Sequence, residues 1–414
     1  MDSKWLNTMA VFDDYERRFA QARADKQPSC PWEPADRERI LAGVKKMLCW
    51  EDALVPQVGE LEECSRRSFD GYCAIEYRYP TWKGFWGSST LFLPETDQKV
   101  PLVFVCCGHG EDGRRTVGYQ AMGHRLASLG MAALVMDNIG QGDRAKEPAV
   151  FKTKDHWFSL APFYCGLTLQ GMIVMETVGL IRKMAADPRF DSNRLAACGN
   201  SGGGTLTMFL GALAPELKAL SSSGYPSEIS YILSKERRHC SCNLLEGAAY
   251  GPEMWEIYSL FAPKPLLLEG GKHDNLIPLD LAHRNARKVK NTYLQMGCDA
   301  FRFQLPNTRH SWELEDLNLI SGFLAAELLG ITPEPMETVP AYEAVPVTMP
   351  PQMLTTDQLA ESLTGKKMPS GTQLWDIYPP TLAGKPVDPE SIVPDVGRGE
   401  VLQVFAQMEC ALKK

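Results

Sequence analysis

The chain of 414 residues lacks the long hydrophobic runs that cross membranes and the basic tracts that bind nucleic acids. No apolar stretch approaches the roughly eighteen residues needed to span a bilayer. Acidic residues outnumber basic ones by 51 to 43, which gives a formal net charge of -8 and leaves no basic tract to neutralise phosphates. We therefore expect neither a membrane nor a nucleic acid among the partners of this protein.

The sequence also lacks an apolar signal-peptide core near its beginning, where charged residues come early. The 12 cysteines are scattered, in a chain far larger than the small domains that disulfides frame. We expect most of them to be buried, reduced thiols and the protein to be cytoplasmic. Hydrophobic residues at 44% and charged residues at 23% are typical of a soluble globular protein.

Hydrophobic periodicity divides the chain into three parts. Residues 1–70 indicate a polar, helical N-terminal extension, within which 37–48 has apolar residues spaced by about 3.6 positions. Residues 71–330 begin with two apparent strands and then alternate short apolar runs with helical patterns. Residues 331–414 open with six closely spaced prolines, which favour an extended arm along a surface, and end in an amphipathic helix at 399–412.

The middle part predicts a mostly parallel central sheet with helices on both faces, which is an α/β fold. The predicted strands of the alternating region are 100–107, 131–137, 194–200, 217–223, 265–270 and 301–305. The predicted helices between them are 116–129, 166–186, 203–214, 279–296 and 311–329. Ligands of such sheets bind beyond the carboxyl ends of the strands.

Ser201 stands in the stretch Gly199-Asn200-Ser201-Gly202-Gly203, between a predicted strand and a predicted helix. A serine in this setting is typical of a nucleophile elbow, in which a strained turn presents the hydroxyl above the sheet. Glycines two positions away on either side let the strand and the helix approach closely. A serine hydroxyl is a poor nucleophile at neutral pH unless a base lies within hydrogen-bonding reach.

Four histidines downstream of the elbow are candidates for that base: His239, His273, His283 and His310. His310 directly follows the last predicted strand, where the base of a chain ordered serine, acid, histidine is expected. His283 lies inside a predicted helix, and His273 is adjacent to the candidate acid, where two side chains rarely face each other. We predict that His310 is the base.

Asp274 is the predicted acid, because it ends the turn after strand 265–270 and so emerges at the same sheet edge as Ser201. Glu269 competes for this role, but its place within the strand would bury a carboxylate beside the sheet. The structural alternative for Asp274 is a residue that caps the helix beginning near 278.

Stabilising an oxyanion needs two backbone N–H donors close to the reacting carbonyl oxygen. We predict that these are the amides of Gly202, which follows the serine, and of His109, in the glycine-containing loop after strand 100–107. The imidazole of His109 could also line the site, although its use as a loop amide is the simpler interpretation.

Aromatic residues after the second strand of the alternating region and in a later excursion are candidates for substrate binding, with ordinary packing as the alternative. They are Trp157, Phe158, Tyr164 and Trp255. Three arginines near strand ends could recognise an acidic or sugar group, or form surface salt bridges. They are Arg114, Arg115 and Arg144.

One cluster, His239-Cys-Ser-Cys-Asn243, suggests a metal site. It lacks a second pair of ligands at a usable spacing. We therefore expect Cys240 and Cys242 to be packing thiols and the protein to hold no metal.

With these residues in place, the chain resembles the α/β-hydrolase superfamily and, within it, the acetyl xylan esterase and dienelactone-hydrolase-like branch. The motifs that carry the resemblance are Gly108-His-Gly110, Asp137 to Arg144, Gly166 to Gly171, the Ser201 elbow, His239 to Asn243, and the loops of Asp274 and His310. The resemblance covers about residues 95–330 and implies a Ser201, Asp274 and His310 triad, no cofactor and an ester substrate. Dienelactone hydrolases carry cysteine where this chain has Ser201, so that activity itself is not implied.

The resulting hypothesis is a carboxylic ester hydrolase that removes acetyl or other short acyl groups from a carbohydrate or a small natural product. The alternatives are an acyltransferase or a peptidase with the same triad, or a non-catalytic binding protein of this fold. A peptidase would usually carry a propeller domain, for which the 95 residues before the core are too few. The proline-rich arm favours a homo-oligomer.

Overall fold

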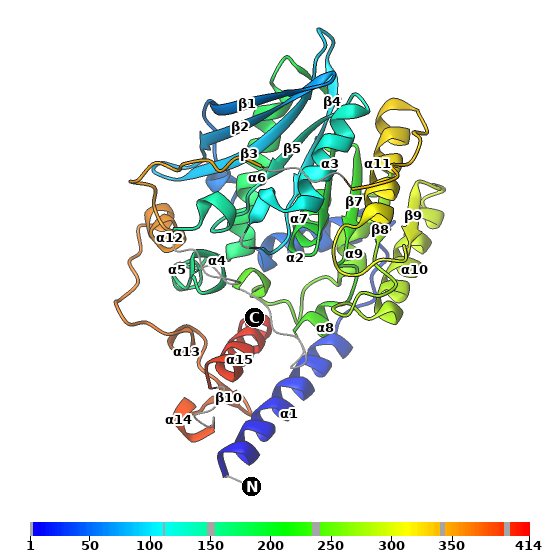
Figure 1. Ribbon diagram of the computed structural model, residues 1–414. Coiled ribbons are helices and arrows are strands. Elements are labelled where there is room, and N and C mark those ends of the chain that lie inside the picture. Colours follow the sequence, from blue (N-terminus) through cyan, green and yellow to red (C-terminus); the bar gives the residue numbers. More distant parts are fainter. Residues whose placement is uncertain (1–2, 111, 147–153, 234–240, 340–343, 393–397) are drawn as a thin grey trace.

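The computed structural model of the protein describes residues 3–110, 112–146, 154–233, 241–339, 344–392 and 398–414 (Figure 1). At its centre is a nine-stranded sheet in the order β1-β2-β3-β5-β4-β6-β7-β8-β9. The strands are β1 (Glu62–Phe69), β2 (Tyr72–Pro80), β3 (Trp86–Pro94), β4 (Val100–Cys106), β5 (Ala132–Met136), β6 (Phe190–Asn200), β7 (Ala219–Ser223), β8 (Leu266–Glu269) and β9 (Phe301–Gln304). Strands β4 to β9 run parallel, whereas β1, β2 and β3 pair antiparallel and join the parallel part through β5.

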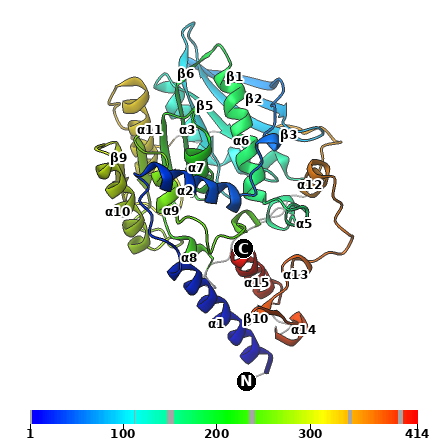
Figure 2. The ribbon, with the colours of Figure 1, turned by 180° about the vertical axis from the view of Figure 1, so that it is seen from behind.

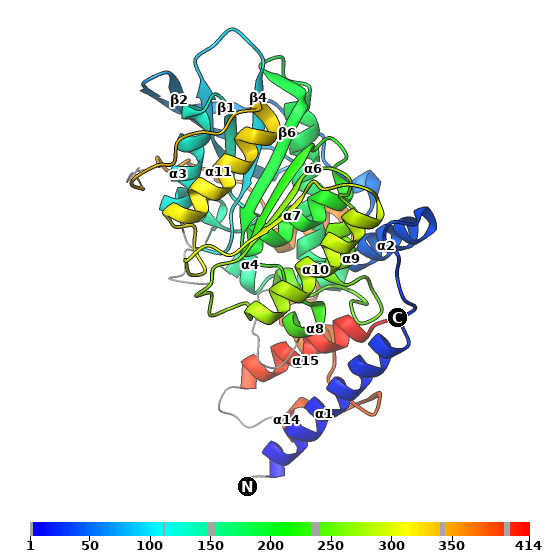
Figure 3. The ribbon, with the colours of Figure 1, turned by 90° about the vertical axis from the view of Figure 1, so that its right-hand side faces the viewer.

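Helices cover both faces of this sheet, as the views from the front, the back and the side show (Figures 1, 2 and 3). One face carries α3 (Val117–Ser128) and α11 (Leu314–Leu329). The other carries α2 (Pro34–Met47), α6 (Leu169–Ala185), α7 (Gly202–Leu213), α9 (Met254–Ser259) and α10 (Leu279–Gln295). Each face has its own hydrophobic core, which confirms the predicted α/β architecture.

Burial on both faces explains why the central strands are recognisable in the sequence. Every residue of β4 and of β5 is buried, so these strands are continuous apolar runs rather than alternating ones. The carboxyl ends of β4 and β6 to β9 lie at one edge of the sheet because these strands run parallel. The loops that follow them therefore meet there.

The predicted boundary of the N-terminal helical extension at residue 70 is wrong. Strand β1 (Glu62–Phe69) lies within that segment and pairs with β2 in the central sheet. Its side chains are mostly polar and exposed or half-buried, as suits the edge of a sheet. It therefore lacks the apolar alternation that marks a half-buried strand.

The N-terminal and C-terminal segments of the chain pack together away from the sheet, where α1 (Ser3–Ala24) contacts the C-terminal helices (Figure 1). The C-terminal elements are α12 (Thr356–Thr364), α13 (Leu374–Ile377), β10 (Thr381–Leu382), β11 (Lys385–Pro386), α14 (Pro389–Ile392) and α15 (Arg398–Leu412). Before α12 the chain runs extended along the core, where the Leu354 amide donates to the Gly84 carbonyl. Short helices α4 (Lys154–Trp157), α5 (Ala161–Cys165) and α8 (Ile229–Ile232) lie in the connections.

Within the described residues, no single helix is long and apolar enough to cross a bilayer. The helical stretches Asp155–Cys165 and Leu169–Ala185 pass that test only as a pair, and the pair is bent by 97°. Most of the second helix is buried in the core between the sheet and its neighbours.

Candidate active site

Ser201 occupies the turn between β6 and α7 with φ 58° and ψ -119°, a backbone conformation that a non-glycine residue seldom adopts. Its amide donates to the Ser223 carbonyl at 2.9 Å, which ties the turn to β7. The close approach of strand and helix requires glycine at 199 and 203. A Cβ at Gly199 would lie 2.4 Å from the Gly203 carbonyl oxygen, and one at Gly203 would lie 1.9 Å from that of Cys106.

Three side chains predicted from separate parts of the sequence meet at this turn. Ser201 Oγ lies 2.8 Å from His310 Nε2, and His310 Nδ1 lies 2.7 Å from Asp274 Oδ2. Because an ionised carboxylate only accepts hydrogen bonds, Nδ1 carries the proton and Nε2 is left to accept from the serine hydroxyl. This order of contacts is the geometry that a serine nucleophile and its base require.

Asp274 is buried, with 2% of its side chain exposed. Burial acts to raise the pKa of its carboxyl, but hydrogen bonds from His310 and from the amides of Leu276 and Ile277 outweigh that effect and hold the pKa below its usual value. Asp274 Oδ1 bonds the turn before α10, but the helix is capped by Pro278 without a side-chain hydrogen bond, so Asp274 is not its cap. Glu269 is buried at the end of β8, and Asp274 is the acid that contacts His310.

The loop after β4 brings the second predicted oxyanion donor next to the serine. A Cβ at Gly108 would lie 3.2 Å from the Cβ of Ser201, and one at Gly202 would lie 2.8 Å from the His109 ring. The His109 imidazole thus covers Gly202, and both predicted donor residues border the nucleophile. Whether their amides bind an oxyanion stays a prediction.

Polar side chains that sequence reasoning missed hold this loop in place. Asn138 Nδ2 donates to the Cys107 carbonyl at 2.7 Å, and Gln141 Oε1 accepts from the Gly110 amide at 3.1 Å. The Tyr119 hydroxyl accepts from the Gly108 amide at 2.6 Å. Asn138 and Gln141 both belong to the segment from Asp137 to Arg144, so the motif was visible in the sequence but its role was not.

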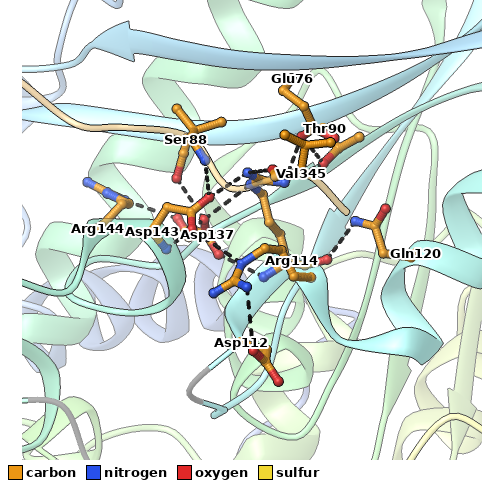
Figure 4. Close-up of polar contacts among 12 residues, drawn as sticks. Glu76, Ser88, Thr90, Asp112, Arg114, Gln120, Asp137, Asp143, Arg144 and Val345 are labelled. Carbon is orange, nitrogen blue, oxygen red and sulfur yellow. Dashed lines mark hydrogen bonds and ion pairs between the residues drawn. The ribbon is translucent and has the colours of Figure 1, made fainter. Parts of the chain in front are cut away.

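Arg114 anchors the far end of the same loop in a fully buried ion network (Figure 4). Its guanidinium contacts Glu76 at 2.7 Å, Asp143 at 2.5 Å and Asp137 at 3.3 Å, and it donates to the Val345 carbonyl at 2.9 Å. The network therefore joins strand β2, two loops at the sheet edge and the C-terminal arm.

The sequence-based interpretations of the arginines are wrong for two of them. Arg114 and Arg144 are buried, and Arg144 forms a two-pronged ion pair with Glu176 at 2.7 and 2.8 Å. They are neither surface salt bridges nor exposed to a substrate. Arg115 is partly exposed and pairs with Asp112 and Asp143.

A cavity of about 170 Å³ opens beside the serine and the histidine. It is lined by His109, Thr116, Gly118, Tyr119, Asn200, Ser201, His310, Ser311 and Trp312. Its walls come from the β4 loop, the start of α3 and the loop that carries the base. A space of this size next to a nucleophile suits a small substituent.

A family model described as acetyl xylan esterase (AXE1) matches residues 75–231. The match runs from β2 to α8 and contains the elbow and the β4 loop. Residues 75–231 are therefore similar to the acetyl xylan esterase (AXE1) family of α/β hydrolases. The resemblance noted in the sequence is thereby confirmed, whereas Asp274 and His310 lie beyond the matched segment.

A relative in Bacillus subtilis (strain 168), YtaP, which is named as a hydrolase, is 25% identical over 182 residues. The aligned part is 43% of this chain and 58% of YtaP, so the chain covers little more than half of that relative's length.

Solved structures of esterases share the fold. Methylesterase BT1017 superposes with a TM-score of 0.57 at 20% identity, covering 77% of this chain and 68% of its own. A Bacteroides fragilis protein described as an acetyl xylan esterase gives 0.57 at 16% identity, covering 69% and 80%. A glucuronoyl esterase from Solibacter usitatus gives 0.51 at 12% identity, covering 72% and 93%.

The aromatic residues predicted to bind substrate are not among the described residues that line the cavity beside Ser201. Trp157 comes nearest, since its ring lies 5.3 Å from that of His109. Phe158 and Tyr164 are exposed, and Trp255 packs under Lys288 of α10. Their part in substrate binding stays a prediction.

The other candidate bases lie elsewhere. His273 bonds Asn307 at 2.9 Å, and the exposed His283 packs edge-on against Phe303. His239 falls outside the described residues. Among the described histidines downstream of the elbow, His310 is the one in contact with Ser201.

The cysteines differ in one respect from expectation. Ten have free thiols, six of them buried, but Cys242 is disulfide-bonded and is not a packing thiol; Cys240 falls outside the described residues. His109, His156 and Cys242 form a described group close enough to hold a metal ion. A sulfur engaged in a disulfide is not a thiolate ligand, so this group does not fit a metal.

Proposed function

We propose that this protein is a serine esterase that hydrolyses short-chain carboxylic esters. The observation that carries the proposal is the continuous set of contacts from Ser201 Oγ through His310 to Asp274, at a strained elbow beside a small cavity. This arrangement leaves a hydroxyl facing open space next to its base.

The reaction follows from the contacts. Ser201 Oγ attacks the ester carbonyl while His310 Nε2 takes the hydroxyl proton, and Asp274 stabilises the imidazolium that forms. The amides of Gly202 and His109 hold the negative oxygen of the tetrahedral intermediate. His310 returns the proton to the departing alcohol, and water then attacks the acyl-enzyme by the same steps.

The substrate we propose is an acetylated or similarly short-chain ester of a carbohydrate or a small natural product. The cavity of about 170 Å³ supports a short acyl group. A carbohydrate alcohol is supported by the AXE1 match and by the names of the structural relatives, which include an acetyl xylan esterase and a glucuronoyl esterase.

The decisive experiment compares wild type with Ser201→Ala on p-nitrophenyl acetate and on acetylated sugars. We expect the variant to lose at least about a thousandfold in kcat, and a fluorophosphonate to label the wild type alone. Turnover that persists in the variant would assign the chemistry to another residue. Transfer of the acyl group to an added alcohol in preference to water would identify an acyltransferase, and labelling without turnover would favour a binding protein.

A further inference from the structure

Apart from the triad, two carboxyl groups lie together in the core between the sheet and α11. Glu269 ends β8 and is 2% exposed, and Asp316 stands in the first turn of α11 and is 1% exposed. Their side chains hydrogen-bond to each other, in a layer with the apolar side chains of Leu267 and Leu317. Two carboxylates in contact in such surroundings repel each other, which favours a form in which the pair keeps one proton.

Asp316 is the member of the pair that is surrounded by hydrogen-bond donors. Its Oδ1 accepts from the Thr308 hydroxyl and its Oδ2 from the Glu313 amide, each at 2.8 Å, and it lies at the positive end of α11. Glu269 Oε2 finds no hydrogen-bond partner among the described residues. Burial, followed by the negative charge of Asp316, raises the pKa of Glu269 well above its usual value.

This pair is bonded to both sides of the loop that carries His310. Thr308, two residues before the histidine, bonds Asp316. Trp312, two residues after it, donates from Nε1 to the Ser223 hydroxyl at 3.1 Å, and Ser223 of β7 is paired with Glu269 of β8. The position of the imidazole therefore depends on groups that the catalytic steps do not use.

We propose that Glu269 and Asp316 are positioning residues that share one proton and thereby keep His310 aligned with Ser201. This inference rests on the proposed role of His310 as the base. Loss of the shared proton would place two negative charges in contact. Their repulsion would push Glu269 and Asp316 apart and displace the loop that carries His310. Among the described residues, the carboxylates of Asp274 and Glu313 also act on the pair and oppose its ionisation further.

The test is the alkaline side of the pH profile of kcat/KM. Wild type is expected to lose activity there as the pair ionises. Glu269→Gln keeps a neutral hydrogen-bonding side chain that cannot ionise, so it should retain activity within about threefold at neutral pH. Its alkaline loss should begin at least about one pH unit higher. Asp316→Asn removes the like charge and should shift the loss in the same direction.

Glu315→Gln is the matched control. Glu315 stands in the same turn and accepts from the Asn307 amide at 2.6 Å, but it is exposed and outside the pair. Its variant should keep the alkaline loss of the wild type. An unchanged profile in both Glu269→Gln and Asp316→Asn would overturn the proposal.

Two measurements do not depend on activity and so separate this inference from the proposed function. Because the pKa of Glu269 is raised on folding, its contribution to stability is lost as pH rises toward that pKa. The Tm of Glu269→Gln should therefore fall less than that of wild type between neutral and alkaline pH. The infrared spectrum of the wild type at neutral pH should contain a protonated-carboxyl band. Its absence would overturn the proposal even if neither variant folds.

Discussion

The side-chain amide of Asn200 donates to the backbone carbonyl of His310, with 3.1 Å between nitrogen and oxygen. The residue immediately before the nucleophile thus binds the loop that carries the base. Asn200 is confined on its other side, since a Cβ at Gly224 would lie 2.4 Å from its Oδ1. The distance between serine and imidazole is therefore set by the elbow itself as well as by the loop.

Replacing Asn200 with alanine should reduce kcat by about ten- to hundredfold, because a small displacement of the base is costly in a preorganised site. The measurement is steady-state hydrolysis of p-nitrophenyl acetate. Asn318→Ala is the control, since Asn318 also donates to a backbone carbonyl, that of Met336, but away from the site. An equal loss of kcat in both variants would point to a general effect on folding.

Activity should fall on acidification, because a protonated His310 cannot accept the serine proton. Hydrogen bonds hold the pKa of Asp274 below its usual value, so this carboxylate stays ionised to a lower pH than an ordinary aspartate. We therefore expect log kcat/KM to fall with a slope of about one per pH unit. A flat profile down to about pH 4 would contradict His310 as the base.

Asp274→Asn should lower kcat by about a thousandfold or more, because an amide partner no longer stabilises the imidazolium or fixes its tautomer. It should also remove a pH dependence of stability. A carboxyl with a depressed pKa stabilises the fold above its unfolded-state pKa and loses that contribution as pH falls. Thermal unfolding of both proteins across acid pH tests this, and parallel curves would argue against it.

Arg114→Met should destabilise the protein by about 3–5 kcal/mol, because it leaves the buried carboxylates of the network without their cation. Urea unfolding provides the measurement. Arg66→Met is the control, since the pair of Arg66 with Glu63 is exposed and worth about 0–1 kcal/mol. Similar losses of unfolding free energy in the two variants would show that the buried network contributes no more to stability than an exposed ion pair.

Gly203→Ala should abolish activity and destabilise the fold, since the new methyl group would lie 1.9 Å from the Cys106 carbonyl oxygen. Overpacking of this kind costs about 1–3 kcal/mol or more. Gly322→Ala, inside α11 with nothing within 4 Å of the added carbon, should instead stabilise slightly. Full activity in Gly203→Ala would mean that the elbow can relax.

Much of the parallel sheet was predictable, because strands buried on both faces, such as β4 and β5, are short apolar runs between glycine-containing loops. Strand β1 was missed for the converse reason: a polar edge strand has no buried face to mark it. Ser201 was predictable because its strained turn requires glycines on both sides, and these glycines stand next to it in the sequence.

Contacts between segments that are distant in the sequence leave no local sequence pattern from which they could be predicted. The bonds of Asn138 and Gln141 to the β4 loop and the joint burial of Arg114 with three acids depend on which loops meet at the sheet edge. The same holds for Glu269, whose neighbour Asp316 is far along the chain.

The sequence by itself determined the strand–helix alternation, the elbow at Ser201 and the chemical types of its partners, because these depend on local conformational preference and hydrophobic periodicity. Tertiary structure alone decided which arginines are buried, which polar side chains hold the β4 loop and which carboxyls share a site. Those outcomes depend on distances between segments brought together only when the parallel strands align their carboxyl ends.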